Sequence, residues 1–182
     1  VDQICFRFHD SIGIRLEDLK ERPKDTLQAL CRWLDVEETP GLYTMTAQGK
    51  KWWGDPTSPD YDETRPMSPF DLTSIKRPVG TIFSKKDQFI LQTLFYPFST
   101  RFGYRRANLS QFEEDLKSIR PLLDELLDFE RTMLESSMVD PVLFKQSAAY
   151  LTLRACFTER WEVLNESKTY PYMLPPLSLS RE

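Results

Sequence analysis

The spacing of apolar side chains changes from a strand-like to a helix-like period near the beginning of the chain. Residues 11–16 (Ser-Ile-Gly-Ile-Arg-Leu) alternate between apolar and other side chains, which predicts a short strand that ends at the polar residues 17–19. Beyond Pro23, which suits the first turn of a helix, apolar side chains recur at helical spacing: Leu27, Leu30, Cys31 and Leu34. We therefore expect a helix that ends near Trp33-Leu34, and a strand followed by a helix is typical of an α/β fold.

A capping pattern predicts another helix in the middle of the chain. Ser84 stands three residues before Asp87, the spacing of a capping box, and apolar positions at helical spacing follow until Pro97: Phe89, Ile90, Leu94 and Phe95. Ser84 is therefore expected to be a helix N-cap. An anion bound at the same helix N-terminus is the alternative for Ser84, Lys85 and Lys86.

The last third of the chain is also predicted to be helical. Residues 110–113 (Ser-Gln-Phe-Glu) have the pattern of a capping box, and an apolar face continues through a kink or restart at Pro121: Leu116, Ile119, Leu123, Leu126 and Phe129. Asp140-Pro141 predicts a further helix with Phe144, Leu151 and Ala155 on one side. Such stripes are typical of a core or of a surface for a partner helix, so a homo-oligomer through the C-terminal helices stays open. Residues 170–180 are expected to be an extended tail on the surface or on another chain.

A long irregular connection separates the first predicted helix from the helix that follows Ser84. Residues 39–83 contain six prolines: Pro40, Pro56, Pro59, Pro66, Pro69 and Pro78. A connection of this length in a compact domain is usually a lid or binding loop. Three acidic residues within it, Asp60, Asp62 and Glu63, lack the spacing of a calcium loop, and we expect them to be solvated.

The candidate binding residues lie inside this connection. They are two lysines and two tryptophans between two glycines: Gly49, Lys50, Lys51, Trp52, Trp53 and Gly54. Glycine permits close approach of the backbone, lysine supplies charge for phosphate or sulfate, and an indole can stack on a nucleobase. This combination predicts a loop for an anionic nucleotide. The alternative is a surface turn whose tryptophans pack on the domain and whose lysines are solvated.

Composition narrows the classes of function. The chain has 182 residues, of which 40% are hydrophobic, enough for one domain or one and a half with a real core. Without an apolar run long enough for a membrane span or a signal peptide, we expect a cytoplasmic protein. Cys5, Cys31 and Cys156 lack metal-ligand spacing and are expected to be reduced, and the one histidine, His9, is expected to be structural or solvent-facing. No metal site is predicted.

Charge is distributed unevenly along the chain. The formal net charge is −4, which argues against general binding of nucleic acid. Residues 76–106, however, contain seven basic side chains and a single acid, Asp87, which gives this segment a charge of 7 − 1 = +6. Beyond residue 106 acidic side chains predominate. This pattern favours a local anion site over a groove for a polymer.

The order of these features resembles a known family. The features are residues 14–19 (Ile-Arg-Leu-Glu-Asp-Leu), Pro23, Thr26-Leu27, a helix ending at Trp33-Leu34, the loop 49–55, residues 83–87 and Phe102-Gly103-Tyr104. Together they are similar to the C-terminal half of a sulfotransferase domain. The resemblance implies an α/β fold: residues 1–104 would be the C-terminal portion of a P-loop-like sulfotransferase domain, with one or two parallel strands plus helices. Residues 105–182 would be a helical extension with a Pro-rich tail, which makes the chain mainly α.

The resemblance also implies a reaction and its co-substrate. Sulfotransferases transfer a sulfuryl group from 3'-phosphoadenosine 5'-phosphosulfate (PAPS) to a hydroxyl or amine of a small-molecule acceptor, without a metal. Lys50 and Lys51 would supply charge to the nucleotide, Trp52 or Trp53 a stacking surface, and Gly49 and Gly54 close backbone approach. The family's phosphosulfate loop and catalytic base precede the part that is matched, so no catalytic residue is assigned, and we expect the full protein to be longer.

Two other classes of function stay open. A different α/β nucleotide-dependent transferase, such as a small-molecule kinase, would use the same loop but require magnesium. A non-catalytic helical interaction module would rest on residues 105–182.

Overall fold

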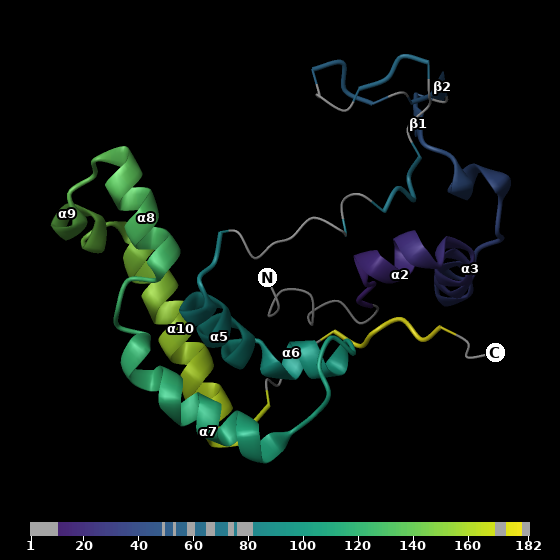
Figure 1. The fold of residues 1–182 in the computed structure, drawn as a ribbon. Coiled ribbons are helices and arrows are strands. Elements are labelled where there is room, and N and C mark those ends of the chain that lie inside the picture. The colour runs from purple at the N-terminus through teal and green to yellow at the C-terminus, as the bar shows by residue number, and fades with distance from the viewer. Residues whose placement is uncertain are drawn as a thin grey trace. The chain divides into compact units, whose positions relative to one another are not determined.

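The computed structural model describes residues 11–48, 50–52, 54–57, 61–64, 68–72, 75, 82–169 and 174–179. Its contacts divide the described chain into two compact units (Figure 1). The N-terminal unit contains the described residues from 11 to 75 together with 175–179, and the helical unit contains residues 82–169 and 174. The predicted boundary between residues 104 and 105 falls inside the helical unit.

The N-terminal unit begins with two consecutive helices. Helix α2 covers Leu16–Glu21, and α3 covers Pro23–Leu34 with Pro23 in its first turn, so the predicted helix is confirmed. Residues 17–19 were expected to be a polar turn, but Glu17 and Asp18 lie in the first turn of α2, where carboxylates are favourable. The Thr26 hydroxyl, fully buried, donates to the Asp18 carbonyl oxygen and ties the two helices together.

The strand predicted at residues 11–16 is reduced to a single bridge. Gly13 pairs in parallel with Pro176 of the C-terminal tail: its amide donates to the Pro175 carbonyl and its carbonyl accepts from the Leu177 amide, both at 2.8 Å. Beyond Ile14 the chain turns into α2, because six alternating residues are too few to outweigh the helical preference of the segment that follows. The described part of the tail therefore lies on this chain.

A short hairpin follows a 3-10 turn. The turn, η1, covers Pro40–Tyr43, and strands β1 (Thr46–Ala47) and β2 (Lys50–Lys51) pair antiparallel, with Thr46 opposite Lys51 and Ala47 opposite Lys50. Within the described residues there is no parallel sheet, so the α/β part of the expected fold is not confirmed. The expectation of a mainly α chain is confirmed.

The helical unit contains six α-helices and a 3-10 turn among its described residues. They are α5 (Lys85–Leu94), α6 (Tyr96–Arg101), α7 (Leu109–Ile119), η3 (Arg120–Leu122), α8 (Asp128–Ser137), α9 (Pro141–Lys145) and α10 (Ala148–Ser167). The capping box of Ser84 and Asp87 is confirmed, and so is the restart at Pro121, which opens η3. Asp140 caps α9 through its side chain, as predicted.

Two helix starts differ from the sequence prediction. Asn108, rather than Ser110, is the N-cap of α7 and accepts from the Gln111 amide at 3.3 Å. The helix that begins at Pro141 ends after five residues, and Ser147 caps a separate helix, α10, by accepting from the Tyr150 amide. Both differences arise because several neighbouring polar residues can cap a helix, and packing selects among them.

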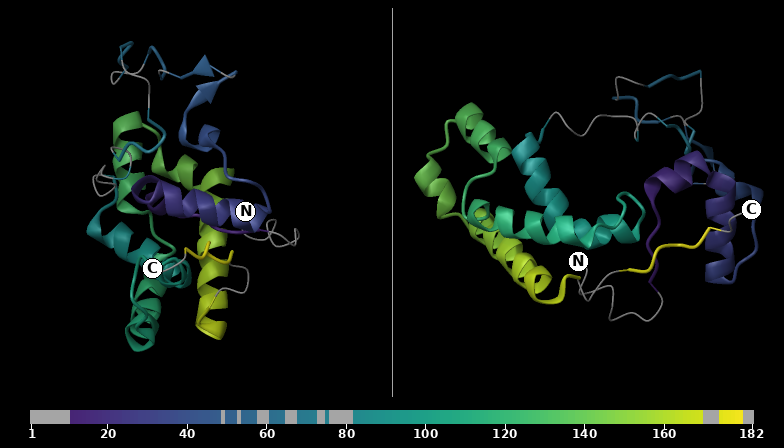
Figure 2. Two further views of the ribbon diagram at one scale, coloured as in Figure 1. Left: turned by 90° about the vertical axis from the view of Figure 1, so that its right-hand side faces the viewer. Right: turned by 60° about the horizontal axis from the view of Figure 1, so that its bottom comes forward.

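The core of the helical unit lies between α5, α7 and α10. Its fully buried side chains include Ile90 and Leu94 from α5, Phe112 and Ile119 from α7, and Leu164 from α10. These three helices lie side by side in both views of Figure 2. The Trp161 indole of α10 adds a hydrogen bond of 2.7 Å to the Leu116 carbonyl of α7.

Candidate functional site

The candidate nucleotide loop is built on the β1–β2 hairpin. The pairing of Ala47 with Lys50 places Gln48 in the connection between the strands, with a φ of 52° in the left-handed region. Just beyond β2, the Trp52 amide donates to the Met45 carbonyl at 3.1 Å and extends the pairing by one residue. The hairpin therefore fixes the backbone on both sides of the two lysines.

Two candidate side chains are presented to solvent by this hairpin. Lys50 is exposed, and Trp52 is 38% exposed. Because side chains in an extended segment alternate between its two faces, positions 50 and 52 share one face. An ammonium group and an indole on one face provide charge and a stacking surface for the same ligand.

Two residues after Trp52 stands a glycine with a positive φ. Gly54 is buried and has a φ of 103°, a conformation that strongly favours glycine. Asp55 then closes a local turn, since its carboxylate accepts from both the amide and the hydroxyl of Thr57, at 2.9 and 2.8 Å. These hydrogen bonds lower the pKa of Asp55.

Contacts within the N-terminal unit hold both flanks of the long connection. Before the hairpin, Tyr43 donates to the Glu38 carboxylate at 2.5 Å, and Gln28 of α3 donates to the same group at 3.0 Å. After the hairpin, Lys20 of α2 donates to the Asp71 carbonyl at 2.8 Å, and the Phe70 ring lies 6.3 Å from the Tyr43 ring. The helices α2 and α3 thus act as the scaffold for the connection.

The structure places only part of the predicted loop. Gly49 and Trp53 lie outside the described residues, and Lys51 is placed through its backbone pairing with Thr46. Of the six predicted binding residues, the structure brings Lys50 and Trp52 to one face of the hairpin and places Gly54, with its positive φ, two residues after Trp52. The antiparallel hairpin itself was not predicted from the sequence.

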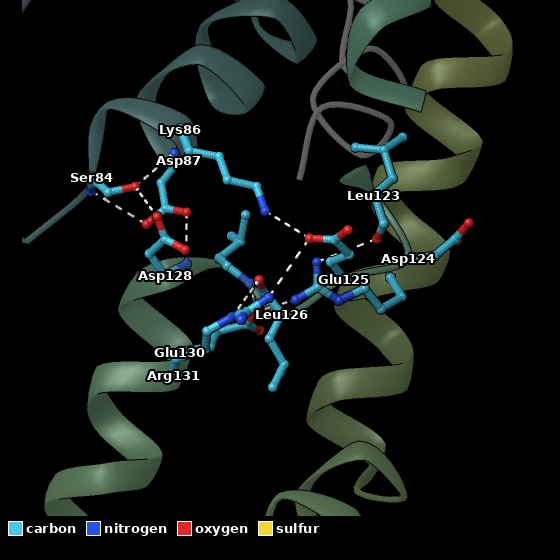
Figure 3. Close-up of polar contacts among 12 residues, drawn as sticks. Ser84, Lys86, Asp87, Leu123, Asp124, Glu125, Leu126, Asp128, Glu130 and Arg131 are labelled. Atoms are coloured by element: carbon cyan, nitrogen blue, oxygen red, sulfur yellow. Dashed lines mark hydrogen bonds and ion pairs between the residues drawn. The ribbon is translucent and has the colours of Figure 1, made fainter. Parts of the chain in front are cut away.

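The alternative anion site at Ser84–Lys86 is occupied by the protein's own groups (Figure 3). The Ser84 hydroxyl donates to the Asp128 carboxylate at 2.6 Å and accepts from the Asp87 amide at 3.1 Å. Lys86 contacts Glu125 at 2.7 Å, which lowers the pKa of Glu125. The prediction of Ser84 as an N-cap is therefore confirmed, and these groups serve the packing of α5 against α8.

A second buried polar group in the helical unit is also structural. Glu130 of α8 pairs with Arg154 of α10 and accepts from the Leu127 amide at 2.7 Å. The Arg154 guanidinium lies 4.8 Å from the centre of the Tyr150 ring and 5.6 Å from that of Phe157. The sequence did not indicate this pair, because its members lie 24 positions apart and meet only through the packing of α8 on α10.

The described residues show neither a metal cluster nor a membrane-spanning helix. In the described ranges, no three His, Cys, Asp or Glu side chains gather as metal ligands would. None of the helices in that part of the chain has the length and apolar character needed to cross a membrane. Comparisons with protein-family models, curated proteins and solved structures find no match to this chain.

Proposed function

We propose that the N-terminal unit binds the adenosine 3',5'-bisphosphate part of PAPS and that the protein is a sulfotransferase. The observation that carries the proposal is the hairpin that presents Lys50 and Trp52 on one face, two residues before a glycine whose φ of 103° favours glycine. Its support from sequence is the resemblance of residues 11–104 to the C-terminal half of a sulfotransferase domain.

Each described residue of the loop has a part in this proposal. The Lys50 ammonium pairs with the 3'-phosphate, and the Trp52 indole stacks on the adenine ring. Gly54, buried and with a φ of 103°, sets the course of the backbone beyond the indole. In the transfer, the sulfuryl group leaves the phosphate oxygen of PAPS and bonds to the acceptor oxygen or nitrogen, which loses its proton to a base.

The experiment is a calorimetric titration of the chain with adenosine 3',5'-bisphosphate. We expect Lys50→Ala and Trp52→Ala each to weaken binding by about 10- to 100-fold, the range for loss of a charge-assisted hydrogen bond or of one stacked base. The matched controls are Lys24→Ala and Trp33→Ala, an exposed lysine and a 40% exposed tryptophan on α3 of the same unit, which should leave the affinity unchanged.

A second ligand identifies the group that Lys50 contacts. Adenosine 5'-monophosphate lacks the 3'-phosphate, so it should bind the wild-type chain more weakly, and Lys50→Ala should remove most of that difference. Failure of the wild type to bind the bisphosphate, or equal losses in the α3 controls, would contradict the proposal. Binding that requires magnesium would favour a kinase-like transferase instead.

A further inference from the structure

An apolar cavity of about 310 Å³ lies between α8, α9 and α10 of the helical unit. Figure 1 shows these three helices together at one end of that unit. The apolar walls of the cavity are formed mainly by Phe129, Met133, Leu134, Val139, Phe144 and Leu153. Met133 is 59% exposed, so the cavity opens to solvent at the rim that this residue forms.

The caps of the three helices explain why this space is left unfilled. Helix α8 ends at Ser137; its C-cap Met138 has a φ of 54° in the left-handed region, and Asp140, the N-cap of α9, follows only two residues later. Helix α9 ends after five residues, since Ser147 already caps α10. An α9 of little more than one turn cannot cover the faces of α8 and α10. The Phe144 ring reaches the Tyr150 ring, 5.6 Å away, and closes one side.

The polar side chains in the wall already have partners. Glu130 pairs with Arg154 and accepts from the Leu127 amide. The Ser137 hydroxyl donates to the Met133 carbonyl at 2.6 Å, and the Tyr150 hydroxyl makes a long contact of 3.5 Å with the Asp124 carbonyl. A charged ligand would lose its hydration without gaining a free counter-charge, so the cavity selects against it.

We propose that this cavity is a binding site for an uncharged, apolar small molecule. Because the cavity opens to solvent, its apolar walls are exposed to water, and a ligand that fills it removes this apolar surface from water and gains van der Waals contacts. An apolar cavity of about 150 Å³ takes up benzene, so a space about twice as large suits a bicyclic aromatic group or a medium-length alkyl chain. The site is independent of the proposed nucleotide loop.

The test is a fluorescence titration of the 182-residue chain with the neutral probe N-phenyl-1-naphthylamine. We expect saturable binding of one probe per chain, competed by decanol and not by decanoate. Ala149→Phe fills the cavity from its rim and should weaken probe binding at least about tenfold. Ala148→Phe is the matched control, because Ala148 is also exposed, precedes Ala149 in α10 and is not among the lining residues.

Absence of saturable binding, equal loss in both variants, or stronger competition by decanoate would overturn the proposal. A wild-type dimer that rejects the probe and becomes monomeric in Ala149→Phe would assign the cavity to a second copy of the chain instead. Circular dichroism checks that each variant is folded. If Ala149→Phe is not folded, Met133→Trp, which narrows the cavity from its exposed rim, replaces it in the same titration.

Discussion

The backbone amide of Asp128, the first residue of α8, donates to the carboxylate of Asp87 in α5 at 2.8 Å. The next amide, that of Phe129, donates to the other oxygen of the same carboxylate at 3.0 Å. Asp87 also accepts from the Ser84 amide within its own capping box and is fully buried. One carboxylate therefore caps two helix N-termini whose sequences lie about forty residues apart, and it fixes α8 against α5.

We expect Asp87→Ala to lower the free energy of unfolding of the helical unit by about 3 kcal/mol. The substitution leaves buried amide donors of two helices without an acceptor, and each such loss costs about 1–3 kcal/mol. Urea unfolding followed by circular dichroism measures the change. The control is Asp124→Ala, which removes an exposed carboxylate paired with Arg120 and should cost under about 1 kcal/mol. Equal effects of the two substitutions would refute the double-cap interpretation.

The helices that were predicted correctly are those with local signals. Pro23, the Ser84–Asp87 capping box and Asp140-Pro141 each define a helix start within four residues of sequence. Helix α2 lacks such a signal: it has six residues, and its N-cap Arg15 makes no side-chain cap. The second role of Asp87, as the cap of α8, was not predictable, because it depends on packing between distant segments.

We expect residues 82–169 to fold without the rest of the chain and residues 105–182 to fail to do so. Ile90 and Leu94 of α5 are fully buried in the same cluster as Phe112, Leu116 and Leu164, so a fragment that begins at residue 105 exposes this core. Circular dichroism and thermal unfolding of the two fragments provide the measurement. A cooperative transition in the 105–182 fragment would instead support a domain boundary at residues 104 and 105 and the interaction-module hypothesis.

The stability of the N-terminal unit should fall at high pH through Tyr43. Its phenol donates to Glu38, and this hydrogen bond raises the pKa of Tyr43 from 10.0 to about 12. Because the folded pKa lies above the unfolded one, the stabilisation is complete below about pH 10 and is lost as the pH rises toward 12. Stability should therefore decline more steeply over this range in the wild type than in Tyr43→Phe, as measured by urea unfolding at each pH.

Titration of Tyr43 by NMR provides the matching direct test. In Glu38→Gln the anionic acceptor is replaced by a neutral one, so the pKa of Tyr43 should move back toward 10.0. The Tyr43→Phe spectrum assigns the resonance. A wild-type Tyr43 that titrates near pH 10 would show that its hydrogen bond to Glu38 does not persist in solution.

The composition of the candidate loop was visible in the sequence, but its geometry was not. Lysine, tryptophan and glycine indicated ligand chemistry, whereas the face shared by Lys50 and Trp52 follows from the pairing of β1 with β2. That pairing depends on the turn at Gln48, whose positive φ is uncommon for a residue with a side chain and gives no clear sequence signal. For residues 84–86 the sequence allowed an anion site, but the structure pairs Ser84 with Asp128 and Lys86 with Glu125.

The position of Gly54 makes a prediction that separates loop geometry from direct ligand contact. A residue with a Cβ is strained by about 1–3 kcal/mol at φ 103°, so Gly54→Ala should shift the backbone around position 54. We expect the affinity for adenosine 3',5'-bisphosphate to fall severalfold although alanine removes no group that binds the ligand. Gly41→Ala is the control, because a Cβ there meets only the Thr39 hydroxyl oxygen, at an ordinary 3.7 Å. Calorimetry of both variants tests this, and unchanged affinity in Gly54→Ala would show that the backbone conformation at Gly54 does not position Trp52.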